Sequence, residues 1–271
     1  MLSLAFSPCP NDTFIFAALV HGWIDREGLT FDYQMADVEE LNLMALSGNA
    51  DMIKVSFHAW LSIREHYELL ESGSALGFGN GPLVVAKSRI PSFRFPGNGE
   101  GSQGQISDIR VALPGEHTTA HLLFNLAYPQ VTKKEFMLFS DIERAVLSGE
   151  VDAGVIIHES RFTYQQKGLV KLMDLGEFWE EKSASPIPLG GIIAKRHLGE
   201  ETLDRLNRIM RRSVQFAIKN PDGVMNFVRE HAQEMDDSVI RKHIDLYVNR
   251  FTLDLGEDGS RAIQTLIDIY D

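Results

Sequence analysis

A short sequence pattern, Leu-Ser-Gly-x-x-Asp, occurs twice in this chain, at residues 46–51 and again at residues 147–152. Each copy follows a stretch with acidic residues near its start that predicts a helix, and each leads into an apolar stretch that predicts a buried strand. Earlier in each half, a further predicted strand, at residues 2–6 and 109–113, precedes a turn that contains proline and then a helix. Because the order of elements agrees in both halves, the sequence predicts an α/β protein of two lobes.

The length of the chain, 271 residues with 44% hydrophobic residues, is sufficient for two lobes with cores of their own. We expect a discontinuous first lobe made of residues 1–86 and 191–271, and a second lobe made of residues 87–190. Residues 88–108 are rich in proline and glycine and have no apolar period, which predicts a long loop. Such a loop is either an elaborated linker or a mobile flap, and we favour a surface insertion.

His158 follows the apolar run that begins at Val151, where the predicted strand should end. In open parallel sheets, ligands bind beyond the carboxyl ends of the strands, and an imidazole held there is well placed for proton transfer. A lone histidine is more often a core or capping residue. The functional interpretation of His158 therefore depends on what lies at the other strand ends.

Polar side chains follow three other predicted strands, and two facing lobes would bring them together around a cleft. Hydroxyl groups, helix N-termini and one lysine suit a small, oxygen-rich, anionic molecule. The lysine lies within an apolar strand, so it either reaches a ligand near the strand end or lies on the surface of an edge strand. These candidate substrate-binding residues are Ser7, Cys9, Asn11, Lys54, Ser56, Thr118 and Thr119.

Composition excludes several classes of function. A net charge of −12 argues against nucleic acid and against an anionic membrane surface as partners. The single cysteine, Cys9, allows no intrachain disulfide, and the N-terminus does not resemble a signal peptide, so we expect a cytoplasmic protein. The sequence has no dinucleotide-binding motif and no P-loop, so we expect no cofactor. His117 and His121 have the spacing of two metal ligands on a helix, but no third ligand is evident, so we also expect no metal.

Three motifs resemble those of the 1,4-dihydroxy-6-naphthoate synthases of the futalosine route to menaquinone. They are Ser-Pro-Cys-Pro-Asn-Asp-Thr-Phe at residues 7–14, Gly-Glu-His-Thr-Thr-Ala at 115–120, and Ile-His-Glu-Ser-Arg-Phe-Thr-Tyr at 157–164. The resemblance implies a periplasmic-binding-protein-like fold of type 2. It also implies conversion of cyclic dehypoxanthinyl futalosine to 1,4-dihydroxy-6-naphthoate without a cofactor. By the same resemblance, His158 is the proton acceptor, and Lys54-Val55-Ser56 and Thr118-Thr119 line the substrate site.

Our hypothesis is that neutral His158 removes a proton from the substrate, after which a sugar-derived fragment leaves and the naphthoate ring becomes aromatic. Lys54 or a helix N-terminus would bind the substrate carboxylate, and Arg161 could do the same or face solvent. Two alternatives stay open at this point: the chorismate dehydratase activity of the same pathway, and a non-catalytic protein that binds an anionic solute. The sequence is compatible with a monomer and with a homodimer.

Overall fold

The computed structural model describes residues 1–90, 93, 106–233 and 236–271. Most of the segment at residues 88–108 therefore lies outside the described residues, and its interpretation as a surface insertion stays a prediction. Within the described ranges, no helix combines the length and the apolar character needed to cross a membrane.

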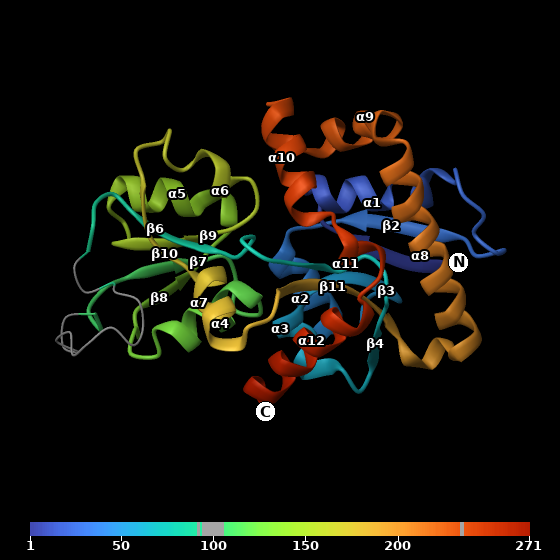
Figure 1. The fold of residues 1–271 in the computed structure, drawn as a ribbon, viewed down its shortest axis with the longest axis horizontal. Coiled ribbons are helices and arrows are strands. Elements are labelled where there is room, and N and C mark those ends of the chain that lie inside the picture. Colours follow the sequence, from blue (N-terminus) through green and yellow to red (C-terminus); the bar gives the residue numbers. More distant parts are fainter. Residues whose placement is uncertain (91–92, 94–105, 234–235) are drawn as a thin grey trace. The chain divides into compact units, whose positions relative to one another are not determined.

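Two compact units make up the protein (Figure 1). One consists of Met1–Gly77 together with Pro188–Asp271, and the other of Phe78–Ile187. The boundaries differ from the expected ones. The strand at residues 83–86, which we had expected in the first lobe, belongs to the second unit because both of its partner strands lie there.

The sheet of the first unit is built around strand β3 (Met52–Ser56), whose five residues are all buried. Strand β1 (Leu2–Phe6) runs parallel to β3 on one side, and β11 (Ile187–Lys195) runs antiparallel to it on the other. The strand order is β2-β1-β3-β11-β4, and β5 also pairs with β11, so β3 is an interior strand. The remaining strands are β2 (Phe31–Met35), β4 (Tyr67–Leu69) and β5 (Ala75–Gly77).

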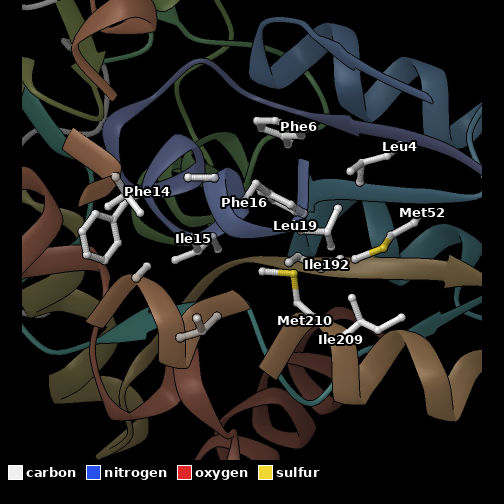
Figure 2. Packing of buried hydrophobic residues seen from close by; sticks show 14 of the residues in the cluster. Leu4, Phe6, Phe14, Ile15, Phe16, Leu19, Met52, Ile192, Ile209 and Met210 are labelled. Carbon is white, nitrogen blue, oxygen red and sulfur yellow. The ribbon is translucent and has the colours of Figure 1, made fainter. Parts of the chain in front are cut away.

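Helix α1 (Pro10–His21) is buried along most of its length and packs against α8 (Glu200–Lys219) and α10 (Asp237–Tyr247). Figure 2 shows part of this core, in which the ring of Phe16 stacks on Phe6 of β1 with the ring centroids 4.3 Å apart. Burial of each such side chain contributes about 1.5–3 kcal/mol, so packing fixes α1 and the turn that precedes it. The other helices are α2 (Val38–Leu46), α3 (Phe57–Ile63), α9 (Pro221–His231), α11 (Arg250–Leu253), α12 (Gly256–Tyr270) and the 3-10 helix η1 (Arg196–Leu198).

The start of α1 differs from what the sequence suggests. Asn11 and Asp12 are of residue types that often cap a helix, but Cys9 is the N-cap residue here. The Cys9 side chain makes no capping hydrogen bond, and Pro10 is the first helical residue. A proline is favourable there because its missing N–H would have no intrahelical partner. The helix ends at His21, and Gly22 follows it with a left-handed φ of 70°, a conformation that glycine adopts easily. The side chain of Asp12 is thereby available for other contacts.

The sheet of the second unit has the order β10-β6-β9-β7-β8. Strand β7 (Val111–Leu113) runs parallel to β9 (Ala153–Ile156), and β6 (Leu83–Ala86) runs antiparallel to β9. All four residues of β9 are buried, as expected for a central strand. The remaining elements are β8 (Lys134–Phe136), β10 (Val170–Asp174), α4 (Thr119–Ala127), α5 (Phe139–Ser148), α6 (Ser160–Thr163) and α7 (Leu175–Ser183).

The internal repeat is confirmed in the topology and in its hydrogen bonds. The orders β2-β1-β3-β11 and β8-β7-β9-β6 correspond strand by strand, with the same parallel and antiparallel pairings. Asp51 Oδ2 accepts the backbone N–H of Ser3 at 3.0 Å, and Asp152 Oδ2 accepts that of Arg110 at 2.9 Å. The last residue of each sequence repeat thus ties the start of one strand to its parallel neighbour.

Helix α5 begins without the local cap that its sequence suggests. The sequence at residues 140–143 suggests a capping box, but the helix starts at Phe139 and its N-cap residue makes no side-chain hydrogen bond. Glu143 is buried instead, and its Oε2 accepts hydrogen bonds from Ser160 at 3.1 Å and from Lys167 at 2.6 Å. Contacts distant in sequence have therefore replaced the local cap.

Candidate active site

The turn between β1 and α1 is organised by Asp12, a buried carboxylate with 3% of its surface exposed. Its Oδ2 accepts the hydroxyl of Ser7 at 2.7 Å, and its Oδ1 accepts the amide of Asn11 at 2.9 Å. The hydroxyl oxygen of Ser7 also accepts the backbone N–H of Cys9 at 3.3 Å. Asn11 Oδ1 lies 2.8 Å from Nε2 of His243, which is wholly buried on α10. The three residues predicted in this turn thus belong to one network, together with an acid and a histidine that the sequence analysis did not select.

Lys54 joins the same network from β3. Its Nζ lies 3.2 Å from Asp12 Oδ1 and donates a hydrogen bond to the carbonyl oxygen of Gly73 at 2.7 Å. The interpretation of Lys54 as a surface lysine on an edge strand is wrong, because β3 is interior and the residue is 7% exposed. An ammonium group has three N–H donors, and the described residues provide partners for two of them. The third donor can bind an oxygen of a ligand.

Val55 and Ser56 complete the carboxyl end of β3, and both are buried. The neighbouring strand approaches closely there, since a Cβ atom on Gly190 would lie 2.8 Å from the carbonyl oxygen of Val55. Both the backbone N–H and the hydroxyl of Ser56 contact the side chain of Asn42 on α2. The strand end is therefore held from two sides within the unit.

Thr118 and Thr119 lie at the start of α4 in the second unit, and both are 2% exposed. Thr118 is the N-cap residue, whose hydroxyl accepts the backbone N–H of His121 at 3.2 Å and donates to the carbonyl oxygen of Gly115 at 2.8 Å. The turn before α4 is thus closed by hydrogen bonds of its own, as expected for a rigid N-cap.

The imidazole of His121 has hydrogen-bond partners within the second unit. The ring nitrogens of His121 lie 2.7 Å from the carbonyl oxygen of Glu116 and 2.9 Å from the amide of Asn125. Asn125 in turn accepts a hydrogen bond from Lys134, whose pKa is lowered by burial. Across the described part of the chain, no cluster of three or more potential ligands is placed to hold a metal ion.

His158 lies two residues after the end of β9 and is half-buried. Its φ of 55° lies in the left-handed region, which costs a residue with a side chain about 1–3 kcal/mol and persists only where the surroundings impose it. Two contacts help to impose it. The ring of Phe139 packs edge-on against the imidazole at a centroid distance of 4.9 Å, and Ser160, two residues further on, is bonded to buried Glu143.

Arg161 lies in α6, close after His158 in the sequence, but its guanidinium group has partners within the second unit. It donates to Asp174 Oδ2 at 2.8 Å and to the carbonyl oxygen of Gly81. Asp174 also caps α7, so Arg161 connects that helix to the segment that enters β6. The alternative in which Arg161 simply faces solvent is wrong, since its side chain is only 16% exposed, and its contact with substrate stays a prediction.

The sequence analysis did not select Asp12, Asn42, Glu143 or His243. A signal existed for two of them, because polar residues on the apolar face of a helix need a partner when they are buried. Asn42 shares a helical face with Ala45, and His243 shares one with Tyr247. Their hydrogen-bond partners, however, come from other elements and cannot be read from the pattern.

A family model described as menaquinone biosynthesis matches residues 2–271. The chain belongs to this family. A 1,4-dihydroxy-6-naphthoate synthase of Thermus thermophilus is 45% identical over 98% of this chain and 92% of the relative. A protein of the same name from Streptomyces coelicolor is 44% identical over 98% of this chain and 91% of its own length. The family resemblance carried by the three sequence motifs is thereby confirmed.

Solved structures similar to this family member agree on the fold. Protein AF1704 from Archaeoglobus fulgidus, at 33% identity, matches with a TM-score of 0.89 over 99% of this chain and 96% of that one. The periplasmic aliphatic sulphonate binding protein SsuA from Escherichia coli matches with a TM-score of 0.63 over 99% and 86%, at 10% identity. The second similarity concerns the fold alone, and it identifies the fold as that of the periplasmic binding proteins.

Proposed function

We propose that this member of the menaquinone biosynthesis family is a 1,4-dihydroxy-6-naphthoate synthase that acts on cyclic dehypoxanthinyl futalosine and needs no cofactor. Two relatives that carry this enzyme name are 44–45% identical to the chain over nearly its whole length. The proposal includes a small anionic substrate, a monomer or homodimer, and a cytoplasmic location. The last point is supported by the single cysteine, which suits a reducing compartment.

The observation that best supports catalysis is the backbone of His158. A strained left-handed conformation two residues after the end of a buried central strand fixes where the imidazole is presented. Simple capture of an anion has no need for a group that accepts a proton, whereas a lyase that begins with deprotonation does. In the proposed reaction, His158 takes a proton from substrate carbon, the electron pair left behind expels the sugar-derived fragment, and the ring gains aromaticity.

The binding groups in the proposal are those at the strand ends of each unit. Lys54, with a third N–H donor that has no partner among the described residues, would contact the substrate carboxylate. The hydroxyl protons of Ser7 and Thr118 are already donated within the chain, so the hydroxyl of Ser56 and backbone N–H groups of the turns before α1 and α4 would contact the remaining oxygens. The apolar side chain of Val55 would contact the ring. The proposed substrate contacts are Ser7, Cys9, Asn11, Lys54, Val55, Ser56, Thr118, Thr119 and Arg161.

Incubation of the purified protein with each of two substrates tests the proposal. We expect cyclic dehypoxanthinyl futalosine to yield 1,4-dihydroxy-6-naphthoate, detected by its absorbance and by mass spectrometry, and we expect chorismate to be left unchanged. Consumption of chorismate would assign the chain to the dehydratase activity instead. Tight binding of the futalosine without any product would indicate a solute-binding protein.

A further inference from the structure

The side chain of Asn42 is fully buried on α2 and is bonded to the carboxyl end of β3. Its Oδ1 accepts the backbone N–H of Ser56 at 2.9 Å, and its Nδ2 lies 3.2 Å from the hydroxyl oxygen of the same residue. A single amide thus contacts both the backbone N–H and the hydroxyl group of Ser56.

The orientation of the Asn42 amide follows from this pair of contacts. A backbone N–H can only donate, so the amide atom opposite it must be the oxygen. The NH2 group then faces Ser56 Oγ, and the same nitrogen lies 3.2 Å from Glu39 Oε2, which can only accept when it is ionised. Both neighbours therefore require the same orientation, in which Asn42 donates to the Ser56 hydroxyl oxygen.

The hydroxyl of Ser56 consequently has its own proton left to donate. Ser56 is the N-cap residue of α3, where a serine oxygen usually accepts an N–H of the first turn, but here it makes no capping bond. Among the described residues, no acceptor lies opposite the Ser56 hydroxyl proton. A buried donor of this kind calls for an acceptor from outside the chain.

The second copy of the repeat has a corresponding arrangement. Asn42 stands four residues before the first Leu-Ser-Gly, and Glu143 stands four residues before the second. Glu143 is also buried, and it bonds the hydroxyl of Ser160, two residues after His158. In both units, a buried polar residue on the helix that precedes the central strand holds a serine at or just beyond that strand's end.

We infer that Asn42 is a positioning residue that makes Ser56 a hydrogen-bond donor to an oxygen of the substrate. The inference rests on the proposed function, because Ser56 is a proposed substrate contact. Asn42 does not touch the substrate itself. Its NH2 group donates a hydrogen bond to the hydroxyl oxygen of Ser56, and the hydroxyl proton is therefore left to be donated to the substrate.

The substitution Asn42→Asp tests the direction of this hydrogen bond with little change of shape. A carboxylate keeps the acceptor for the Ser56 N–H but replaces the donor by a second acceptor, so the hydroxyl proton of Ser56 turns inward. The substrate loses one hydrogen bond, and we expect KM to rise about three- to tenfold with kcat changed much less, since a net hydrogen bond is worth about 0.5–1.5 kcal/mol. Ser56→Ala should raise KM by a similar factor.

A double-substitution cycle separates positioning from a general loss of structure. If Asn42 acts through Ser56, adding Asn42→Asp to Ser56→Ala raises KM no further, whereas independent multiplication of the two effects would overturn the inference. The new carboxylate would lie near Glu39, so the same cycle in a Glu39→Gln background serves as the matched control for charge repulsion.

The remaining outcomes are also decisive. A Ser56→Ala enzyme with the KM of the wild type would overturn the inference however the Asn42 variants fold, because the hydroxyl would then make no bond to the substrate. A wild-type protein that forms no naphthoate would instead overturn the proposed function, and the inference with it.

Discussion

The buried ion pair between Asp12 and Lys54 makes a quantitative prediction about the first unit. The two side chains are 4% and 9% exposed, and the carboxylate also accepts hydrogen bonds from Ser7 and Asn11. In Asp12→Asn, the amide oxygen can still accept one of these bonds, but the ammonium of Lys54 stays buried with no opposite charge. Removal of one partner from a buried pair costs about 3–5 kcal/mol.

For a protein of this size, each kcal/mol lowers the Tm by about 2–4 °C, so we expect Asp12→Asn to lower it by roughly 6–20 °C. Thermal unfolding at pH 7, followed by circular dichroism, measures the shift. The matched control is Asp108→Asn, because Asp108 pairs with Lys133 at 2.9 Å in a setting where the side chains are 78% and 52% exposed. An exposed pair contributes only about 0–1 kcal/mol, so this variant should unfold close to the wild type.

The double variant Asp12→Asn with Lys54→Met removes both buried charges. We expect it to regain at least half of the lost stability, because replacement of a complete buried pair by uncharged groups is often close to neutral. Equal Tm values for Asp12→Asn and Asp108→Asn would refute the reasoning. So would a double variant that is no more stable than Asp12→Asn. Substrate turnover should stay low even when stability returns, since Lys54 is also a proposed substrate contact.

Two further predictions concern stability. Gly81→Ala should lower the free energy of unfolding, measured by urea titration, by about 1–3 kcal/mol, because the new Cβ atom would lie 2.4 Å from backbone atoms of Gly176. An unchanged urea midpoint would contradict this close approach. Hydrogen bonds from Arg208 and Arg212 lower the pKa of Glu27 from 4.5 to about 2, so this carboxylate stabilises the fold above pH 4.5 and loses that contribution as the pH falls toward 2. Glu27→Gln should therefore show a smaller loss of stability between pH 4.5 and 2, and urea midpoints that fall in parallel with the wild type would contradict it.

The repeat in the sequence was sufficient to predict much of the fold. Because each copy contains the same order of elements, it predicts two α/β units and the parallel neighbours of each central strand. It could not predict which strand covers the other side of β3. That strand is β11 (Ile187–Lys195), which returns to the first unit after the whole second unit has been built. For this reason the environment of Lys54 stayed undecided until the structure showed an interior strand.

The sequence was sufficient to predict which strand ends carry the residues of the candidate site. It was not sufficient to predict the hydrogen-bond partners that hold those residues in place. His243 is 232 residues away from Asn11, its hydrogen-bond partner, and no local pattern connects the two. At α5 the local pattern was misleading, because Glu143 matches a capping box but is bonded to Ser160 and Lys167. A side chain with the sequence pattern of a helix cap acts as a cap only where no buried polar group from another element competes for its hydrogen bonds.

The central claim of this account is that the imidazole of His158 accepts a proton in the formation of naphthoate. Its most direct test is a comparison of His158→Ala with the wild type, in which naphthoate formation is measured by absorbance and substrate binding by calorimetry. His197→Ala, at an exposed histidine of the first unit, serves as the control. We predict that His158→Ala binds substrate but forms product about 100- to 10,000-fold more slowly, with an unchanged circular dichroism spectrum. Product formation by His158→Ala at the rate of the wild type would contradict the claim.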